Sequence, residues 1–427
     1  MNTGYSRRWA IFAVTSSLFF LSQFYRASNA VIAPQLTRDL NLDTQALGTL
    51  SAAYFYAFAL TQIPVGILLD RLGPRRLMTA LSVVGVLGAL VFSLADSLAL
   101  GLLGRVLLGV GTACNLMGTF KLLTVWFGPL RFATLTGLVF SLGTVGNMTA
   151  TTPLVLLVQG VGWRITFQGI AGINLLLTAV LFIVVRDRPG ETASVSPYPE
   201  EVPARKGLRG VFGDLGRLFR DRSYWVISLG TLVSYGVFAA FQTLWAGPFL
   251  MEVMGCSALH AGNLIFLFSL GLILGGPGLG ALSDRVFRTR KWMVLCGHVL
   301  LTFITFTLAG LSPGRGLELL ALLFFAFGLF RGTGFLMYPH IKELMPIEMA
   351  GAAMTGINFF TMIGPALFLH GLGAMMQHLY PHASRGPEAF RAAFFLCALC
   401  LAFVSLLYLL TRDPGCGSEE TSQQADR

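Results

Sequence analysis

The chain has 427 residues, of which 55% are hydrophobic and only 12% are charged, and its formal net charge is +10. A water-soluble protein of this length could not bury so much apolar surface, so the composition excludes a soluble globular protein. Apolar runs of about 20 residues, enough to cross a bilayer core, recur along the chain and indicate a protein surrounded by lipid.

Two sets of apolar runs predict an all-α membrane protein with twelve transmembrane helices in two six-helix pseudo-repeats. The first set covers residues 9–33, 45–69, 77–95, 98–127, 132–158 and 163–185. The second set covers residues 224–251, 260–282, 292–311, 317–338, 350–377 and 389–410. The stretch between the sets is rich in proline and charge. We therefore predict an N-terminal bundle over 1–185, a cytoplasmic linker over 186–223, a C-terminal bundle over 224–410 and a cytoplasmic tail over 411–427.

The distribution of the 30 lysine and arginine residues predicts the orientation of the helices. With the N-terminus inside, most of them fall in cytoplasmic segments, and the opposite side holds only Arg38, Arg164, Arg315, Arg385 and Arg391. Because basic residues concentrate in cytoplasmic loops, we expect both termini in the cytoplasm and a location in the cell inner membrane. These loops face anionic lipids, so the positive charge gives no reason to expect nucleic-acid binding.

Two similar segments lie about half a chain apart. The first is Gly66-Ile-Leu-Leu-Asp-Arg-Leu-Gly-Pro-Arg-Arg76, and the second is Gly280-Ala-Leu-Ser-Asp-Arg-Val-Phe-Arg-Thr-Arg-Lys291. An aspartate at a helix end can pair with loop arginines and with the positive end of a neighbouring helix, so we expect a gating role. The residues assigned to the gate are Asp70, Arg71, Arg75, Arg76, Asp284 and Arg285. The alternative is that both loops only anchor the topology.

The first segment resembles the loop between helices 2 and 3 of the major facilitator superfamily of transporters, which reads G-x-x-x-D-R-x-G-x-R-R. The second copy keeps the first glycine, the Asp-Arg pair and the trailing basic residues, but has Phe287 in place of the second glycine. The resemblance covers nearly the whole chain. It implies two six-helix halves that transport a solute by alternating access, and no enzymatic activity.

Four charged residues fall well inside the predicted helices, and all of them are positive: Arg26, Arg105, Lys121 and Arg331. A charge at bilayer depth costs several kcal/mol unless it faces a cavity or a partner, so these residues are functional candidates. No aspartate or glutamate lies well inside a predicted helix. The simplest missing partner is therefore a small anionic solute.

Arg26 lies in Phe24-Tyr-Arg-Ala-Ser-Asn-Ala-Val-Ile-Ala-Pro34. This segment resembles the first helix of the anion:cation symporter family within the superfamily, and the resemblance continues through residues 62–76. It implies that the chain carries organic anions such as sugar acids and that Arg26 contacts the anion, although Tyr25 replaces the usual aspartate. A guanidinium can hold a carboxylate with two hydrogen bonds. The alternative is that Arg26 extends toward the outer surface.

Lys121 and Arg331 occupy nearly equivalent positions in the fourth helix of each predicted half. Because substrate sites of such repeats lie at the bilayer midplane between the halves, we expect both residues to line one cavity. The alternative is that each side chain extends to a membrane surface. Arg105 lies in Gly104-Arg-Val-Leu-Leu-Gly-Val-Gly111, which resembles the superfamily's fourth-helix motif and implies a structural or coupling bond to carbonyl groups of the first helix.

Polar and aromatic residues inside the helices complete the predicted substrate site. They are Tyr25, Asn29, Tyr54, Gln242, Trp245, Asn358 and His370. For each of them, packing or an interhelical hydrogen bond is the alternative. The cysteine and histidine spacing shows no metal-ligand pattern, so we expect no metal and no cofactor.

These observations predict a monomeric secondary transporter of a small, carboxylate-type organic anion. Coupling to protons and exchange for a counter-anion both remain open, because proton symport usually uses a buried carboxylate or histidine, and His370 or Glu343 would have to serve. The alternatives are a nitrate-like porter of inorganic anions, an effluxer of drugs or metabolites, and a non-transporting receptor on the same fold. The buried cations argue against the receptor, which has no need of them.

Overall fold

The computed structural model describes residues 3–127, 129–188, 218–311, 316–345 and 347–413, and these residues form helices and connecting turns without any strand. The first half contains α1 (Thr3–Ala27), α2 (Asn29–Asp39), α3 (Thr44–Leu72), α4 (Pro74–Ser93), α5 (Leu98–Thr112), α6 (Asn115–Phe127), α7 (Pro129–Thr149) and α8 (Thr152–Val184). The second half contains α10 (Arg222–Ala240), η1 (Phe241–Trp245), α11 (Ala246–Pro248), η2 (Phe249–Val253), α12 (Ala258–Leu282), η3 (Ser283–Phe287), α13 (Lys291–Ala309), α14 (Leu317–Arg331), η4 (Gly332–Leu336), α15 (Met337–Leu344), α16 (Ile347–Leu379) and α17 (Pro387–Tyr408).

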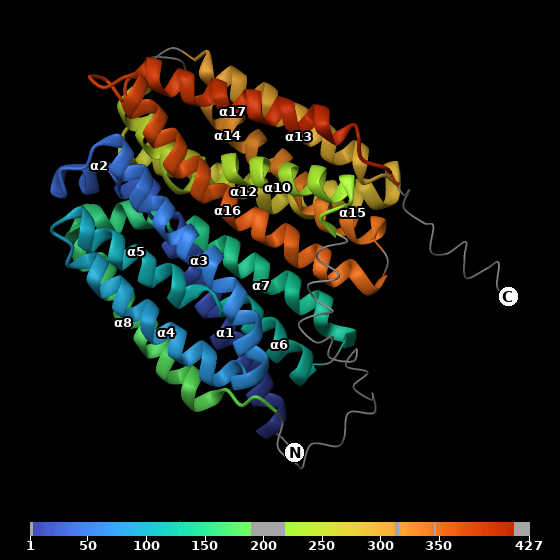
Figure 1. The fold of residues 1–427 in the computed structure, drawn as a ribbon. Helices are drawn as coiled ribbons and strands as arrows, with labels where there is room; N and C mark the ends of the chain where they lie inside the picture. Colours follow the sequence, from blue (N-terminus) through green and yellow to red (C-terminus); the bar gives the residue numbers. More distant parts are fainter. Residues whose placement is uncertain (1–2, 128, 189–217, 312–315, 346, 414–427) are drawn as a thin grey trace.

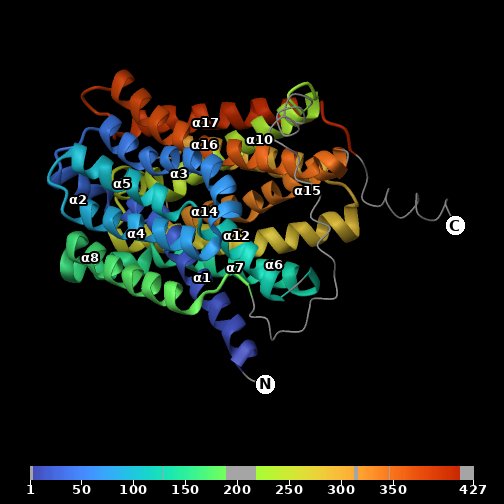
Figure 2. The same ribbon diagram turned by 60° about the horizontal axis from the view of Figure 1, so that its bottom comes forward.

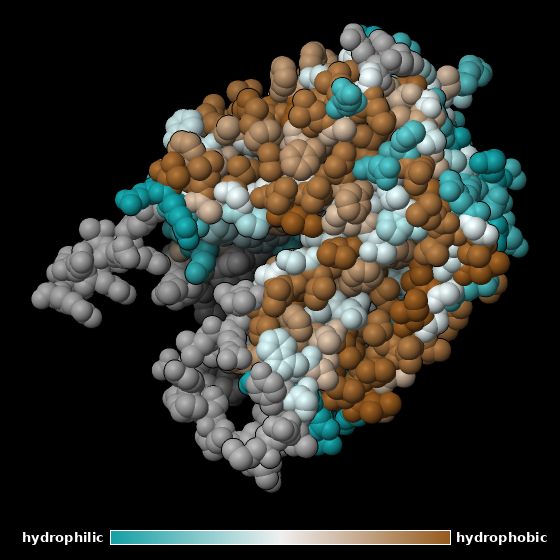
Figure 3. Space-filling model, turned by 180° about the vertical axis from the view of Figure 1, so that it is seen from behind, coloured by the Kyte–Doolittle hydropathy of each residue, from teal (hydrophilic) through white to brown (hydrophobic). Residues whose placement is uncertain are grey.

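The helices gather into two bundles that lie side by side, α1–α8 in one and α10–α17 in the other (Figures 1 and 2). Within the described part, nine helical segments are long and apolar enough to cross a membrane. Hydrophobic side chains cover much of the lateral surface in Figure 3, and hydrophilic side chains gather toward the ends of the helices. The predicted all-α membrane fold is confirmed, and the chain is an integral, multi-pass membrane protein.

Polar residues at helix starts explain several of the observed boundaries. The Asp43 carboxylate accepts a hydrogen bond of 2.6 Å from the Ala46 amide at the start of α3. Asp221 accepts one of 2.8 Å from the Tyr224 amide at the start of α10. Such caps satisfy amide groups that have no partner within the helix.

Two predicted helices are interrupted close to a candidate cation. The first is divided at Ser28 between α1 and α2, and Arg26 lies in the last turn of α1. The tenth is divided between α14 and η4, and Arg331 is the last residue of α14. Interrupted helices bring backbone groups and side chains to the substrate sites of transporters. The breaks therefore mark Arg26 and Arg331 as residues of interest.

Glycine explains one turn of the repeated motif. Gly73 has a φ of 80° between α3 and α4, a conformation that side chains rarely adopt, and a Cβ there would overlap the Asp187 carboxylate. In the second copy, Phe287 ends η3 and the next residue, Arg288, takes the left-handed conformation with a φ of 48°. The loss of the second glycine is therefore accommodated by a different turn.

The two halves are packed tightly at the end of the bundle opposite the basic loops, where α3 crosses α16. A Cβ on Gly48 would overlap the carbonyl oxygen of Leu369, and a Cβ on Gly247 would overlap that of Ala30. Side chains also join the halves here, since the hydroxyls of Thr44 and Ser384 lie 2.6 Å apart. We call this region the closed end.

At the opposite end, each basic loop bonds within its own half. The Arg75 amide donates to the Asp187 carboxylate over 2.7 Å, and Arg290 pairs with Glu343 over 3.2 Å. The surface in Figure 3 is hollowed between the halves on the side where the grey residues lie. Among the residues that the structure describes, the tight contacts between the halves thus lie at the closed end.

The glycine contact makes this state testable. Gly247→Val should weaken the closed end, because overpacking of a close helix contact costs about 1–3 kcal/mol. The fraction of molecules with a closed end can be measured by disulfide formation between Thr44→Cys and Ser384→Cys in a protein whose native cysteines are replaced. In the Gly247→Val variant, the equilibrium constant for closure should fall about five- to hundredfold. Gly278→Val is the matched control, because a Cβ at Gly278 meets no atom within 4 Å. Equal crosslinking in both valine variants would contradict the assignment.

Candidate functional site

Arg26 is buried between aromatic rings near the middle of the bundle. Its side chain is 6% exposed, and its guanidinium carbon lies 5.6 and 5.4 Å from the ring centroids of Phe55 and Phe58. Its Nη1 atom donates a hydrogen bond of 2.8 Å to the Tyr235 hydroxyl, which belongs to the other half. The faces of aromatic rings attract a cation, but they do not neutralise its charge.

Arg331 approaches the same tyrosine from the second half. Its side chain is 4% exposed, and its guanidinium carbon lies 5.2 Å from the Tyr235 ring centroid and 5.6 Å from that of Phe238. Tyr235 on α10 therefore contacts one buried cation from each half of the chain. We call Arg26, Tyr235 and Arg331 the central cluster.

The two arginines retain donors without acceptors. In the described part of the chain, the buried Nε of Arg26 and the buried Nε and Nη1 of Arg331 have no hydrogen-bond partner, and no carboxylate pairs with either residue. A buried donor without an acceptor costs about 1–3 kcal/mol, and more when it is charged. An anion between the halves would supply the missing acceptors and the missing charge.

Tyr338 and Asn358 extend the cluster on the side of the second half. The Tyr338 hydroxyl lies 3.3 Å from the Asn358 Oδ1 and 3.0 Å from the Thr361 hydroxyl. Tyr338 also interacts electrostatically with Arg331. Of the polar residues proposed from the sequence, Asn358 is thus one that the structure brings toward the central cluster.

The other aromatic and polar candidates of the first half bond within that half. The Tyr25 carbonyl accepts a hydrogen bond of 2.9 Å from Arg105, which is the kind of contact that the motif of Arg105 implied. The Tyr54 hydroxyl lies 2.7 Å from that of Thr112, and Tyr54 also interacts with the Arg26 guanidinium, so the structure brings Tyr54 to the central cluster. The Asn29 amide donates to Ser51 over 2.9 Å, an interhelical bond within one bundle.

Three further candidates also lie outside the central cluster. Gln242 donates to the Ser269 hydroxyl over 3.0 Å inside the second half. Trp245 packs against Gly48 at the closed end, and the His370 Nδ1 lies 3.0 Å from the Thr49 hydroxyl across the same contact. Trp245 and His370 therefore belong to the contact that closes the protein.

Lys121 is not brought together with Arg331. Its Nζ donates a hydrogen bond of 2.9 Å to the Leu69 carbonyl near the end of α3. Phe58, which contacts Arg26, lies three turns earlier on the same helix, about 16 Å away at 1.5 Å per residue. Equivalent positions in the repeat thus place the two side chains at different depths.

The gate residues lie at the basic end of the bundle. The side chain of Asp70 lies outside the described part of the chain, and Arg71, Arg76 and Arg285 are exposed. The Arg75 Nε donates to the Phe182 carbonyl over 3.0 Å, and Asp284 pairs with Arg290.

Tyr235 is the main residue that the sequence analysis missed. Phe55, Phe58, Phe238 and Tyr338 were missed with it. Tyr235 and Phe238 precede Gln242 by seven and four residues, so all three lie on one helix face. This spacing was the available signal, although an aromatic stripe is also the ordinary pattern of a packed core.

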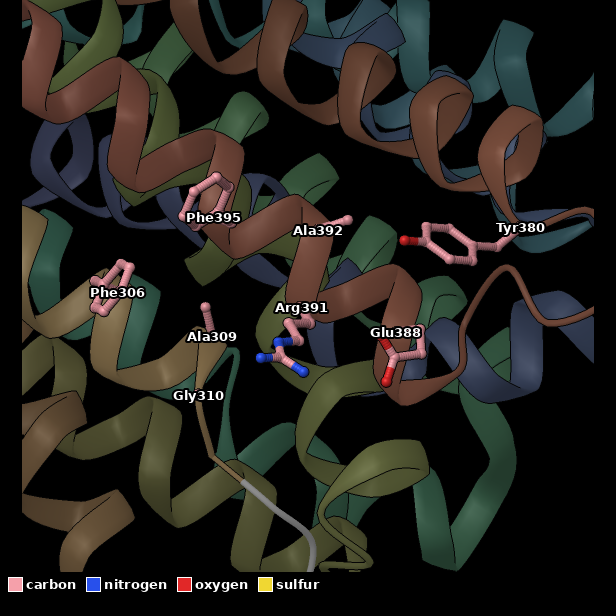
Figure 4. Close-up of a pocket in the computed structure, with 8 residues that line it drawn as sticks. All are labelled: Phe306, Ala309, Gly310, Tyr380, Glu388, Arg391, Ala392 and Phe395. Carbon is pink, nitrogen blue, oxygen red and sulfur yellow. The ribbon is translucent and has the colours of Figure 1, made fainter.

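Two surface cavities lie away from the central cluster. One of about 470 Å³ lies between α13 and α17, and Figure 4 shows Arg391 extending from α17 toward Ala309. Another of about 500 Å³ is lined by Asp39 and Trp163. Both open near the end opposite the basic loops, so neither connects the two arginines. Within the described ranges, no group of His, Cys, Asp or Glu side chains is arranged to hold a metal ion.

Comparisons with known proteins agree with this architecture. The family model of the Major Facilitator Superfamily matches residues 15–369. A probable sulfoacetate transporter of Cupriavidus necator is 22% identical over 84% of this chain and 86% of its own length. A nitrite extrusion protein of Bacillus subtilis is 26% identical over 71% of this chain and 72% of its own. The crystal structure of a bacterial homologue of the lysosomal transporter Spinster, inward-facing and unoccupied, matches with a TM-score of 0.72 and 18% identity, covering 95% of this chain and 96% of that one.

The Tyr235 hydroxyl can be tested apart from any ligand. Tyr235→Phe keeps the ring beneath Arg331 but removes the acceptor of Arg26, so a buried charged donor is left without a partner. We expect the free energy of unfolding to fall by about 1–3 kcal/mol. Thermal unfolding of the purified protein measures the loss, with Tyr380→Phe at the surface cavity as the control. Equal unfolding temperatures of Tyr235→Phe and the unchanged protein would show that this hydrogen bond contributes nothing.

Proposed function

Because the chain belongs to the major facilitator superfamily, we propose that it is a secondary transporter of a small organic anion that works by alternating access. The observation that carries the proposal is the central cluster, in which Arg26 and Arg331 lie buried without a carboxylate partner among the residues that the structure describes. One arginine comes from each half, so an anion bound by both would lie at the interface that opens alternately to the two sides.

The chemistry of the cluster suits an anion that carries oxygen acceptors at two ends. Guanidinium donates hydrogen bonds in a planar fork that matches a carboxylate or a sulfonate. Tyr235 contacts both groups, since its hydroxyl accepts a hydrogen bond from Arg26 and its ring centroid lies 5.2 Å from the guanidinium carbon of Arg331. An anion with a charged group at each end would supply acceptors to both arginines. The probable sulfoacetate transporter among the relatives supports this choice of substrate class.

In the alternating step, the closed end would open and the halves would instead close at the basic loops. The hydroxyl pair of Thr44 and Ser384 and the bond between Thr49 and His370 would break, and the loops that carry Asp70 and Asp284 would approach one another. Each loop now bonds within its own half, so we assign the gate to a change of partners at these loops. We place the basic end and both termini in the cytoplasm and the protein in the inner membrane, by the positive-inside rule.

The second candidate substrate is a small inorganic anion. The nitrite extrusion protein among the relatives supports it. A single charge of this kind could bridge the two arginines only by sitting between them, whereas a longer dianion reaches each one separately. The order of affinities for sulfoacetate, glucuronate and nitrite distinguishes the two candidates.

Calorimetry with these three anions tests the proposed site. Arg26→Lys keeps the charge but loses the fork, and Arg331→Gln loses the charge, so each should lower affinity roughly ten- to hundredfold, the effect of a charged hydrogen bond worth about 1.5–3 kcal/mol. The double variant should lose less than the sum if both residues hold one ligand. Lys121→Gln is the matched control, because its side chain bonds the Leu69 carbonyl. Unchanged affinity in the double variant would refute the site.

A further inference from the structure

His298 is a buried titratable residue that the proposed site leaves unexplained. It lies on α13, its side chain is 1% exposed, and neither ring nitrogen has a hydrogen-bond partner in the described structure. A neutral imidazole carries one donor and one acceptor, and buried polar atoms are nearly always paired. Burying an imidazole without hydrogen-bond partners costs free energy of folding. We therefore look for a function that explains its position.

The position of His298 connects it with Arg331. The preceding residue, Gly297, packs so closely on Thr333 that a Cβ would overlap the threonine hydroxyl. Thr333 lies two residues after Arg331, and Arg331 interacts electrostatically with His298. The imidazole therefore follows a residue that packs on the turn after Arg331, and it senses the charge of Arg331.

A tyrosine and a glycine of two other helices also lie close to His298. The Tyr408 ring on α17 meets the imidazole edge-on, with 5.6 Å between ring centroids, and a Cβ on Gly230 of α10 would lie 3.5 Å from its Cε1. Arg331 and Tyr408 are the charged and titratable groups that face His298 among the described residues. No carboxylate there offsets a charge on the imidazole.

A hydrogen-bonded path continues from Tyr408 to the basic end of the bundle. The Tyr408 hydroxyl lies 2.6 Å from the His340 Nδ1, and the His340 Nε2 lies 2.9 Å from the Arg412 carbonyl. Arg412 is exposed. Tyr408 and His340 thus lie between His298 and the basic end, although neither ring nitrogen of His298 is itself hydrogen-bonded to them.

We propose that His298 is a proton-binding site coupled to the anion site, and that it takes up one proton when an anion neutralises Arg331. The inference rests on the proposed role of Arg331. While Arg331 is unpaired, a second buried cation beside it is strongly unfavourable, because both desolvation and like-charge repulsion oppose it. A bound anion removes the repulsion. The imidazole nitrogen then binds a proton from solvent, and the proton and the anion cross the membrane together.

Thermodynamic linkage makes the coupling reciprocal. If the anion favours protonation of His298 by some factor, protonation raises the affinity for the anion by the same factor. Affinity should therefore rise as the pH falls, by up to about tenfold per pH unit while one proton is taken up. His298→Gln, which cannot be protonated, should show a flat profile.

The experiment adds sulfoacetate to purified protein in weakly buffered solution with a pH indicator, and measures affinity by calorimetry from pH 5.5 to 8. We expect proton uptake approaching one per bound anion in the unchanged protein and none in His298→Gln. His298→Asn is the second variant. His378→Gln, at an exposed site, is the control, and His340→Gln and His370→Gln test the other histidines that bond to protein groups.

The outcomes separate the two proposals. Anion binding without proton uptake in the unchanged protein would overturn the coupling and leave the proposed function standing, and this measurement needs no variant to fold. Normal uptake in His298→Gln, or loss of uptake in His370→Gln alone, would also overturn it. Binding of none of the three anions would refute the proposed function, and the coupling would fall with it. Uptake lost only in the His298 variants supports both.

Discussion

The burial of two guanidinium groups, without an anionic partner in the described part of the chain, is the constraint on which the rest of the structure depends. The rings beneath Arg26 and Arg331 contribute about 0.5–2 kcal/mol each, whereas a desolvated charge costs several kcal/mol. Water or an anion must therefore reach these groups from one side of the protein. The same imbalance makes it unfavourable for both ends to close over an empty cluster, so occupation of the cluster and closure of the halves are physically linked.

The closed end is built so that a ligand can open it. Its backbone contacts depend on Gly48 and Gly247, and its polar bonds are the hydroxyl and imidazole contacts together with a bond of 3.0 Å from the Arg385 guanidinium to the Thr37 hydroxyl. Neutral hydrogen bonds contribute about 0.5–1.5 kcal/mol each, and those of a charged group about 1.5–3 kcal/mol. Reversing a two-state population from 1:99 to 99:1 takes about 5.5 kcal/mol of differential binding, which one doubly charged ligand can supply. The interface is therefore tight enough to exclude solutes and weak enough to exchange.

The sequence predicted the fold and the family from length, apolar runs and the repeated basic loop, because these features are set by the bilayer itself. It also identified Arg26 and Arg331 as candidates, because a charge at bilayer depth is costly unless it faces a cavity or a partner. It could not predict the position of the Lys121 amino group. The repeat predicts the depth of the Cα atom, but the long side chain extends from there to the Leu69 carbonyl. It missed Tyr235 because an aromatic at helical spacing looks the same in a core and in a site. Bonds such as Asn29 to Ser51 depend on partners that only the packing reveals.

The two copies of the basic loop differ in their backbone conformation and in the contacts that hold them. In the first copy, Gly73 permits the positive φ that the turn requires, and the Arg75 amide is fixed to the Asp187 carboxylate. In the second, Arg288 adopts a left-handed conformation that costs a side chain about 1–2 kcal/mol, and the loop is held by the exposed Asp284 and by Glu343 through Arg290. Exposed ion pairs contribute about 0–1 kcal/mol and exchange partners readily. In the gate that we propose, the first loop would be the fixed edge of the opening, and the ion pairs of the second loop would be the contacts that change.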